Sequence, residues 1–254
     1  MSGAAAGPGL VRLLEGLGAA TWPAEMQETV RGWMLGFTRG VTRRANSVIP
    51  LSWTGGELEA AIAEVEARYH GRGLPPCFKM TEAAQPSGLD AALEARGYRV
   101  EGRSWVMTAD AAVTAARCPA VAETAIAPDP DPLWCSLAWP ADRPAGFEAD
   151  IRAGIAGRIG GPRAFATVIC DGRPAGVALG AVVGERCCIT AVSTLPAFRR
   201  RGVARTALGA LAEWATANGA RRLFLQVEEN NPAAIALYRT TGFGRAYDYW
   251  YRVR

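Results

Sequence analysis

The same order of landmarks occurs twice along the chain, and this repeat limits the possible folds more than any other feature. Each half ends in the order strand, helix, strand, helix, glycine–aromatic pair, strand. Three residue pairs share one spacing of 145 positions: Gly97 and Gly242, Tyr98 and Phe243, and Trp105 and Trp250. An internal repeat replaces one large domain with two similar ones. Chance placement of common landmarks is the alternative.

Length and composition also suit two domains. The chain has 254 residues, of which 50% are apolar, enough for two cores. The small-residue stretch Ala109–Arg117 and the proline-rich run 128–132 mark a seam. We therefore place the boundary near Cys118, with domains at residues 1–115 and 118–254. Residues 1–8 are mostly Gly, Ala and Pro and are expected to be disordered.

Several classes of protein are disfavoured by composition. The start of the chain lacks a signal-peptide pattern, and no apolar run approaches the ~18 residues of a membrane span, so we expect a cytoplasmic protein without a membrane partner. The six cysteines form no C-x-x-C pair and His70 is the single histidine. We therefore expect no metal site and reduced, buried thiols. A net charge of +4 without a basic stripe argues against nucleic acid as a partner.

Periodicity and turn residues predict the elements of the first half. The expected helices are Leu10–Leu17, Glu57–Tyr69 and Gly88–Arg96, and the expected strands are Val30–Thr38, Val41–Ile49, Cys77–Met80 and Tyr98–Met107. A turn at Arg39-Gly40 is expected to join the first two strands as a hairpin.

The second half gives a similar series. The expected helices are Asp131–Trp139, Phe147–Ile159, Gly202–Asn218 and Pro232–Thr241, and the expected strands are Ala120–Ile126, Ala164–Cys170, Pro174–Val183, Glu185–Ser193, Leu223–Glu228 and Phe243–Val253. Asp171-Gly172 is expected to form a hairpin turn.

The strongest local signal is a strand that runs through an arginine-rich loop into a helix. The loop reads Phe198-Arg199-Arg200-Arg201-Gly202-Val203-Ala204. The first turn of a helix has backbone N–H groups without partners, and together with the helix dipole these form an anion site. Gly202 permits close approach to the backbone, and the arginines add positive charge. The segment therefore predicts a diphosphate-binding turn, with a solvated helix start as the alternative.

A second signal follows the next strand. Asn231 and Pro232 suit the start of a helix, and Tyr238 lies two turns in. Because Leu237 and Tyr238 point about 100° apart, a buried Leu237 would place Tyr238 at the edge of a cleft. The alternative is a core tyrosine whose hydroxyl group is exposed to solvent.

Together these two segments resemble the GNAT superfamily of N-acetyltransferases. The family pattern Arg/Gln-x-x-Gly-x-Gly/Ala is matched by Arg199, Gly202 and Ala204, and its later Asn, Leu-Tyr and Gly-Phe by Asn231, Leu237-Tyr238 and Gly242-Phe243. The resemblance covers about residues 120–254. It implies an α/β fold with a bent mixed sheet flanked by helices, and with the repeat it implies two such folds in tandem.

The resemblance also implies a site for acetyl-CoA as acyl donor between the fourth and fifth strands of the second half. Backbone groups of Val192, Ser193 and Thr194 would pair with the pantetheine arm. The pyrophosphate would be held by the backbone N–H groups of Arg199, Arg200, Arg201, Gly202, Val203 and Ala204. Asn231 would contact pantetheine, and Tyr238 would stand near the thioester sulfur as general acid.

The chemistry of acyl transfer leaves the other roles open. A backbone N–H near Val192 could stabilise the oxyanion. Glu228 is our candidate base, although Glu229, Glu185 or water could serve instead. The acceptor is expected to be a primary amine, on a small molecule or a protein. A non-catalytic acyl-CoA sensor or interaction module is the alternative function. Nothing in the sequence indicates the oligomeric state.

Two further hypotheses concern the acceptor and the first half. Asp142, Glu148 and Asp150 could attract a cationic acceptor or form a solvated helix face. The polar segment 43–47 could line the acceptor pocket or close its own sheet. The spacing of 145 places Glu57 and Glu59 where the second half has Gly202 and Ala204. We therefore expect the first half to be a degenerate GNAT-like domain that does not bind CoA in the same manner.

Overall fold

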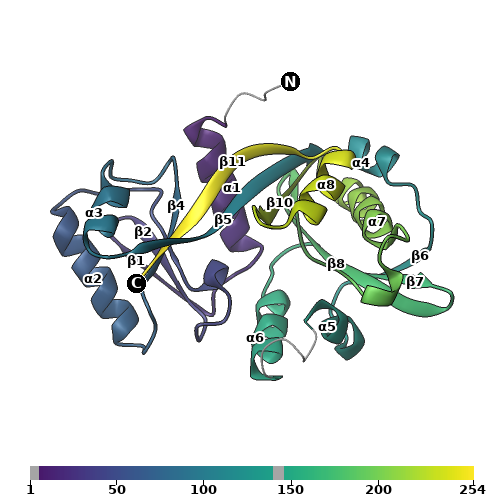
Figure 1. Cartoon of the computed structure of the whole chain (residues 1–254), viewed down its shortest axis with the longest axis horizontal. Coiled ribbons are helices and arrows are strands. Elements are labelled where there is room, and N and C mark those ends of the chain that lie inside the picture. Colours follow the sequence, from purple (N-terminus) through teal and green to yellow (C-terminus); the bar gives the residue numbers. More distant parts are fainter. Residues whose placement is uncertain (1–5, 140–145) are drawn as a thin grey trace. The chain divides into compact units, whose positions relative to one another are not determined.

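The computed structural model describes residues 6–139 and 146–254, which form two compact units (Figure 1). The first unit comprises the chain to Trp105 together with Glu228–Asn230 and Ala246–Arg254. The second comprises Val106–Val227 and Asn231–Arg245. The sequence placed the boundary near Cys118 instead. The stretch expected to be a featureless seam is a helix, α4 (Ala111–Arg117), whose first turn is capped by the Asp110 carboxylate.

The first unit consists of a mixed sheet with helices packed against it. Its helices are α1 (Pro8–Ala20), α2 (Leu58–His70), α3 (Leu89–Ala95) and the 3-10 helix η1 (Arg43–Ala45). Its strands are β1 (Met26–Val30), β2 (Trp33–Phe37), β3 (Val48–Ile49), β4 (Cys77–Thr81) and most of β5 (Arg99–Asp110) and β11 (Gly244–Val253). Strands β1 to β3 are antiparallel, β4 runs parallel to β3, and β11 pairs antiparallel with β4. Residues 6–8, expected to be disordered, lead directly into α1, which begins at Pro8.

The hairpin expected across Arg39-Gly40 is correct in its antiparallel pairing, since β2 pairs with β3, but a long loop joins these strands instead of a tight turn. The tight turn is Arg31-Gly32, with φ values of 47° and 88°, between β1 and β2. Arg39-Gly40 also has positive φ, but it opens a loop that Asn46 closes. The Asn46 Oδ1 accepts from the N–H of Thr38 at 2.6 Å, and its Nδ2 donates to the carbonyl of Val41 at 2.7 Å. Asn46 therefore holds its own loop together.

The second unit contains a sheet in the order β6-β7-β8-β9-β10. Its remaining helices are α5 (Pro132–Ala138), α6 (Gly146–Gly157), η2 (Pro196–Phe198), α7 (Val203–Ala217) and α8 (Pro232–Thr240). Its strands are β6 (Glu123–Ala127), β7 (Arg163–Cys170), β8 (Arg173–Val183), β9 (Arg186–Thr194) and β10 (Arg222–Glu228). Strands β6 to β9 are antiparallel and β10 runs parallel to β9. The predicted Asp171-Gly172 turn joins β7 to β8 with positive φ at both residues.

Helices cover both faces of this second sheet. A Cβ on Gly180 of β8 would meet Leu211 and Trp214 of α7, so α7 packs on that face. The ring of Trp134 in α5 packs edge-to-face against that of Phe165 in β7. Phe165 pairs with Leu179, the residue before Gly180 in β8. Because neighbouring residues in a strand point to opposite faces, α5 covers the other face, and α6 packs beside α5 (Figure 1). The series β9, α7, β10, α8, β11 repeats the series β3, α2, β4, α3, β5 of the first unit. In each series the first two strands are parallel and a helix connects them.

Neither a membrane span nor a metal cluster is found in the described residues. No helix there is long and apolar enough to cross a bilayer. No group of three or more His, Cys, Asp or Glu side chains among them is arranged to hold a metal ion.

Candidate active site

The end of β9 departs from regular strand geometry. Val177 of β8 pairs with Ser193, and Leu179 pairs with Thr190, so Ala191 and Val192 both lie opposite one residue. Ala191 has a φ of 52°, which is uncommon outside glycine. This arrangement is a β-bulge, which bends a strand and redirects its backbone groups.

The same part of β9 also runs past its ladder with β10. The parallel pairing extends from Arg186 and Arg222 to Ile189 and Leu225. Strand β9 continues to Thr194 and β10 to Glu228, so the bulged residues lie beyond the paired segment. The backbone of Val192, Ser193 and Thr194 is therefore placed where an extended ligand could pair with it.

After β9 the chain leads into the start of α7, where the sequence predicts an anion site. Gly202 occupies the N-cap position with a φ of 83° and supplies no side-chain cap. The first helical bond runs from the N–H of Thr206 to the carbonyl of Gly202 at 2.9 Å. The N–H groups of Val203, Ala204 and Arg205 therefore have no partner within the helix. A Cβ on Gly202 would lie 2.8 Å from a methyl of Val121, so packing as well as φ requires glycine there.

The three arginines of the loop differ in their surroundings. Arg199 lines a cavity at the end of β9. Arg200 is exposed and adopts a φ of 64°. Arg201 donates to Asp171 at 2.8 Å and lies over the ring of Phe198. Of these three arginines, Arg199 alone lines the cavity.

The cavity itself has a volume of about 680 Å³, within the range of small-molecule sites. One wall is the bulged strand and the loop after it, and the other is the end of α5 with one face of α6. Its lining residues are Ala138, Trp139, Glu148, Ala149, Arg152, Ala191, Val192, Ser193, Thr194, Leu195, Pro196, Arg199 and Asn231. Five residues expected to bind the donor thus meet in one cavity: Val192, Ser193, Thr194, Arg199 and Asn231.

Helix α8 places its two singled-out residues differently. Asn231 is the N-cap, its Oδ1 accepting from the N–H of Ala234 at 3.1 Å, and it lines the cavity. Tyr238 is only 7% exposed and packs against Phe243, with ring centroids 5.8 Å apart. It does not line the cavity, and burial raises its pKa to about 12. The orientation expected from Leu237 is reversed, because Ile235 and Tyr238 form the buried face of α8.

Glu228 lies in a different hollow, within the first unit. This hollow has a volume of about 520 Å³, and its lining includes Arg43, Glu101, Arg103, Glu228 and Glu229. Arg43 and Glu101 form an ion pair at 2.5 Å. Within the polar segment 43–47, Arg43 therefore lines this hollow of the first unit, and no residue of the segment lines the cavity of the second unit.

Sequence reasoning missed part of the cavity wall. Trp139 and Arg152 were not singled out, although Arg152 follows Glu148 at the i,i+4 spacing that places two side chains on one helix face. Asp150, grouped with Glu148 in the sequence, is exposed and does not line the cavity. Asp142 lies outside the described residues.

In the first unit, the chain after β3, which corresponds to the chain after β9 in the second unit, is hydrogen-bonded to other residues of the same unit. Beyond β3 the carbonyl of Pro50 accepts from the N–H of Gln85 at 2.7 Å, and the carbonyl of Gln85 accepts from Trp33 Nε1 at 2.7 Å. The ring of Trp33 lies 5.1 Å from that of Trp53. Glu57 is the N-cap of α2 and Glu59 lies in its first turn.

Comparison with known proteins gives a consistent result. The model of the family described as "Probable histone acetyltransferase Rv0428c C-terminal" matches residues 9–252. An "Uncharacterized N-acetyltransferase YobR" of Bacillus subtilis is 30% identical over 251 residues, covering 96% of this chain and 98% of that protein.

Solved structures share the fold at low sequence identity. A GCN5-related N-acetyltransferase from Kribbella flavida has a TM-score of 0.68 at 15% identity, over 94% of each chain. A tandem GNAT protein from the clavulanic acid biosynthesis pathway has a TM-score of 0.64 at 13% identity, over 94% of this chain and 87% of that one. The chain therefore belongs to the Rv0428c C-terminal acetyltransferase family and is an N-acetyltransferase enzyme of the GNAT superfamily.

Proposed function

We propose that the chain transfers the acetyl group of acetyl-CoA to a primary amine in the cavity of the second unit. One observation carries this proposal. The bulged end of β9, Arg199 and Asn231 line one cavity, and the loop from Arg199 leads directly into the uncapped start of α7. Such a cavity offers an extended arm a strand to pair with and a diphosphate a helix N-terminus.

The donor is proposed to bind along these features in order. Its pyrophosphate takes the N–H groups of Val203, Ala204 and Arg205, with charge from Arg199 and Arg200. Its pantetheine arm pairs with the backbone of Val192, Ser193 and Thr194 and contacts Asn231. Arg201 contributes less, because it is already paired with Asp171.

Transfer then proceeds by direct attack. The neutral amine nitrogen bonds to the thioester carbonyl carbon, and negative charge develops on the carbonyl oxygen. The backbone N–H near Val192 stabilises that charge, since the bulge turns it out of the ladder. The C–S bond breaks, the new amide nitrogen loses a proton to a base, and the thiolate takes one from an acid.

Tyr238 is proposed as that acid, acting through a water molecule because its side chain does not itself line the cavity. Water is proposed as the base, because Glu228, the candidate from the sequence, lines the separate hollow of the first unit. The raised pKa of Tyr238 keeps its hydroxyl protonated throughout the physiological range. Binding of both reactants in one cavity supplies much of the remaining acceleration.

The test is calorimetric titration with acetyl-CoA, followed by an assay of amine-dependent thiol release. The Arg199→Glu variant places a carboxylate in the cavity and is expected to bind at least about tenfold more weakly. The matched control is Arg221→Glu. Arg221 follows the other end of α7, which spans about 22 Å. Failure of the parent protein to bind acetyl-CoA, or equal weakening by the control, would contradict the proposed donor site.

A further inference from the structure

Two charged residues of α6 line the same cavity as the bulged end of β9. Glu148 and Arg152 both line it, and their side chains are 33% and 27% exposed. The closest approach between them, from Glu148 Oε2 to Arg152 Nη2, is 3.5 Å. This distance is longer than the usual range for a hydrogen bond between nitrogen and oxygen. Among the described residues, each group therefore keeps hydrogen-bonding capacity beyond this pair.

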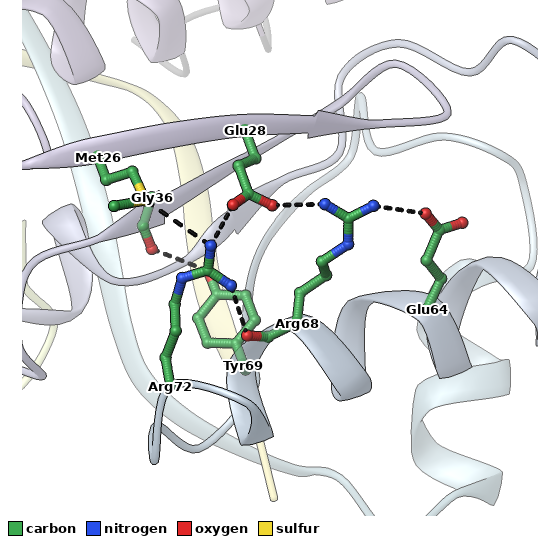
Figure 2. Close-up of polar contacts among 7 residues, drawn as sticks. All are labelled: Met26, Glu28, Gly36, Glu64, Arg68, Tyr69 and Arg72. Atoms are coloured by element: carbon green, nitrogen blue, oxygen red, sulfur yellow. Dashed lines mark hydrogen bonds and ion pairs between the residues drawn. The ribbon is translucent and has the colours of Figure 1, made fainter.

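A second pair at the same spacing shows the contrast. On α2, Arg68 Nη2 donates to Glu64 at 3.2 Å and its Nη1 donates to Glu28 at 2.8 Å (Figure 2). Glu28 in turn also accepts from Arg72. Arg68 is thus satisfied on both sides by its own protein. Within the described residues, Glu148 and Arg152 have only the long ion pair to each other.

The chemistry of this pair selects the ligand that it suits. A guanidinium binds a carboxylate through two parallel hydrogen bonds, and a carboxylate binds an ammonium group. A purely cationic ligand would satisfy Glu148 but meet repulsion from Arg152. A purely anionic ligand would satisfy Arg152 but meet repulsion from Glu148. A ligand carrying both charges a short distance apart satisfies both residues.

We propose that the acetyl acceptor is a small zwitterionic amine of the amino acid class, with its ammonium group at Glu148 and its carboxylate at Arg152. This inference rests on the proposed transfer reaction in the same cavity. Trp139 adds an aromatic surface at the end of α5 for an apolar or cationic part of the acceptor. Because only the neutral amine attacks, Arg152 continues to hold the carboxylate after the nitrogen has lost its proton.

The size of the cavity supports a small acceptor. Its volume of about 680 Å³ must hold both the end of the pantetheine arm and the acceptor. A lysine side chain of a protein would bring an ammonium group but no carboxylate beside it, leaving Arg152 unused. A free amino acid brings both groups on one carbon.

The test is a binding experiment that does not depend on turnover. Protein saturated with CoA is titrated with each of the twenty amino acids by calorimetry. Every amino acid that binds is then compared with its α-amide and with the matching acid that lacks the amino group. We expect the amino acid to bind at least about tenfold more tightly than either analogue, since each analogue loses a hydrogen bond to a charged group.

Two variants and two matched controls assign the effect. Arg152→Gln should abolish the preference over the amide, and Glu148→Gln the preference over the deaminated acid. Glu64→Gln and Arg68→Gln should leave both preferences unchanged, because that pair lies on α2 of the first unit. The CoA affinity of each variant, measured first, shows that it is folded.

The outcomes separate this inference from the proposed function. If CoA fails to bind the parent protein, both fall. If CoA binds but no amino acid does, if the amide binds equally well, or if a lysine-rich peptide binds more tightly than every amino acid, the acceptor assignment is overturned while the donor site stands.

Discussion

At the scale of single residues, Tyr238 has the most specific role to test. A Tyr238→Phe variant keeps the ring that packs against Phe243 and removes only the hydroxyl. If this hydroxyl protonates the leaving thiolate, kcat should fall by roughly 10²- to 10⁴-fold, the usual contribution of a general acid. Affinity for acetyl-CoA should not change. Steady-state kinetics beside a CoA titration measures both, and an unchanged kcat would remove Tyr238 from the mechanism.

The same residue predicts a pH effect on stability. Burial raises the pKa of Tyr238 to about 12, above the ordinary tyrosine value of about 10. The folded protein therefore holds this proton more tightly than the unfolded chain does. The resulting stabilisation is complete below about pH 10 and is lost as the pH rises through about 12. Tyr238→Phe should thus show a shallower loss of unfolding free energy than the parent over that interval.

Urea denaturation at a series of pH values measures this difference. The burial of Tyr98 and Tyr251 also raises their pKa values, so both proteins should lose stability in alkali. The quantity of interest is the difference between parent and variant. Parallel curves would mean that the Tyr238 hydroxyl titrates normally in the folded protein.

At the scale of elements, the close approach of α7 to the chain at Cys118 makes a sharp prediction. Alanine normally stabilises a helix interior by about 1 kcal/mol relative to glycine. A Cβ on Gly209 would, however, lie 2.2 Å from the carbonyl oxygen of Cys118, so helix and chain must separate. Overpacking of this kind costs roughly 1–3 kcal/mol. Gly209→Ala should therefore lower Tm by a few degrees.

Gly154 of α6 supplies the matched control. A Cβ there would meet only the guanidinium of Arg158, at 3.4 Å, which is ordinary contact with a flexible side chain. Gly154→Ala should leave Tm unchanged or raise it. Calorimetric melting of both variants decides the matter, and a raised Tm for Gly209→Ala would show that α7 can move away at no cost.

The elements also show what a sequence can and cannot predict. The start of α7 follows from local chemistry, because a glycine in the left-handed region before an apolar-periodic segment has few other structures open to it. The bulge in β9 gives no such signal, since its left-handed residue is Ala191 rather than glycine. The dipeptides Arg31-Gly32 and Arg39-Gly40 both adopt positive φ. Pairing of β1 with β2 makes Arg31-Gly32 a tight hairpin turn, whereas the Asn46 hydrogen bonds make Arg39-Gly40 part of the longer loop between β2 and β3.

At the scale of the whole molecule, pairing between distant parts of the chain is what the sequence conceals. Val253 of β11 pairs with Cys77 of β4, and Tyr249 pairs with Thr81. No local pattern reports such a partner, because alternation describes the faces of a strand and not its neighbours. For the same reason β11 was assigned wholly to the second half, whereas Ala246–Arg254 belongs to the first unit.

The repeat in the whole molecule leads to a prediction of stoichiometry. Each unit has a parallel strand pair connected by a helix, so the first unit repeats the framework on which we propose the donor site of the second. In the first unit the N-cap of α2 is Glu57, and Glu59 follows in its first turn, so a phosphate would meet like charge there. The chain beyond β3 is also hydrogen-bonded to Gln85. We therefore expect one molecule of acetyl-CoA to bind per chain. The titration should show one binding transition, and Arg199→Glu should weaken that transition. Isothermal titration measures both numbers. A second transition that survives Arg199→Glu would show that the first unit binds the donor too, and that its carboxylates and its Trp33–Trp53 packing do not close the site.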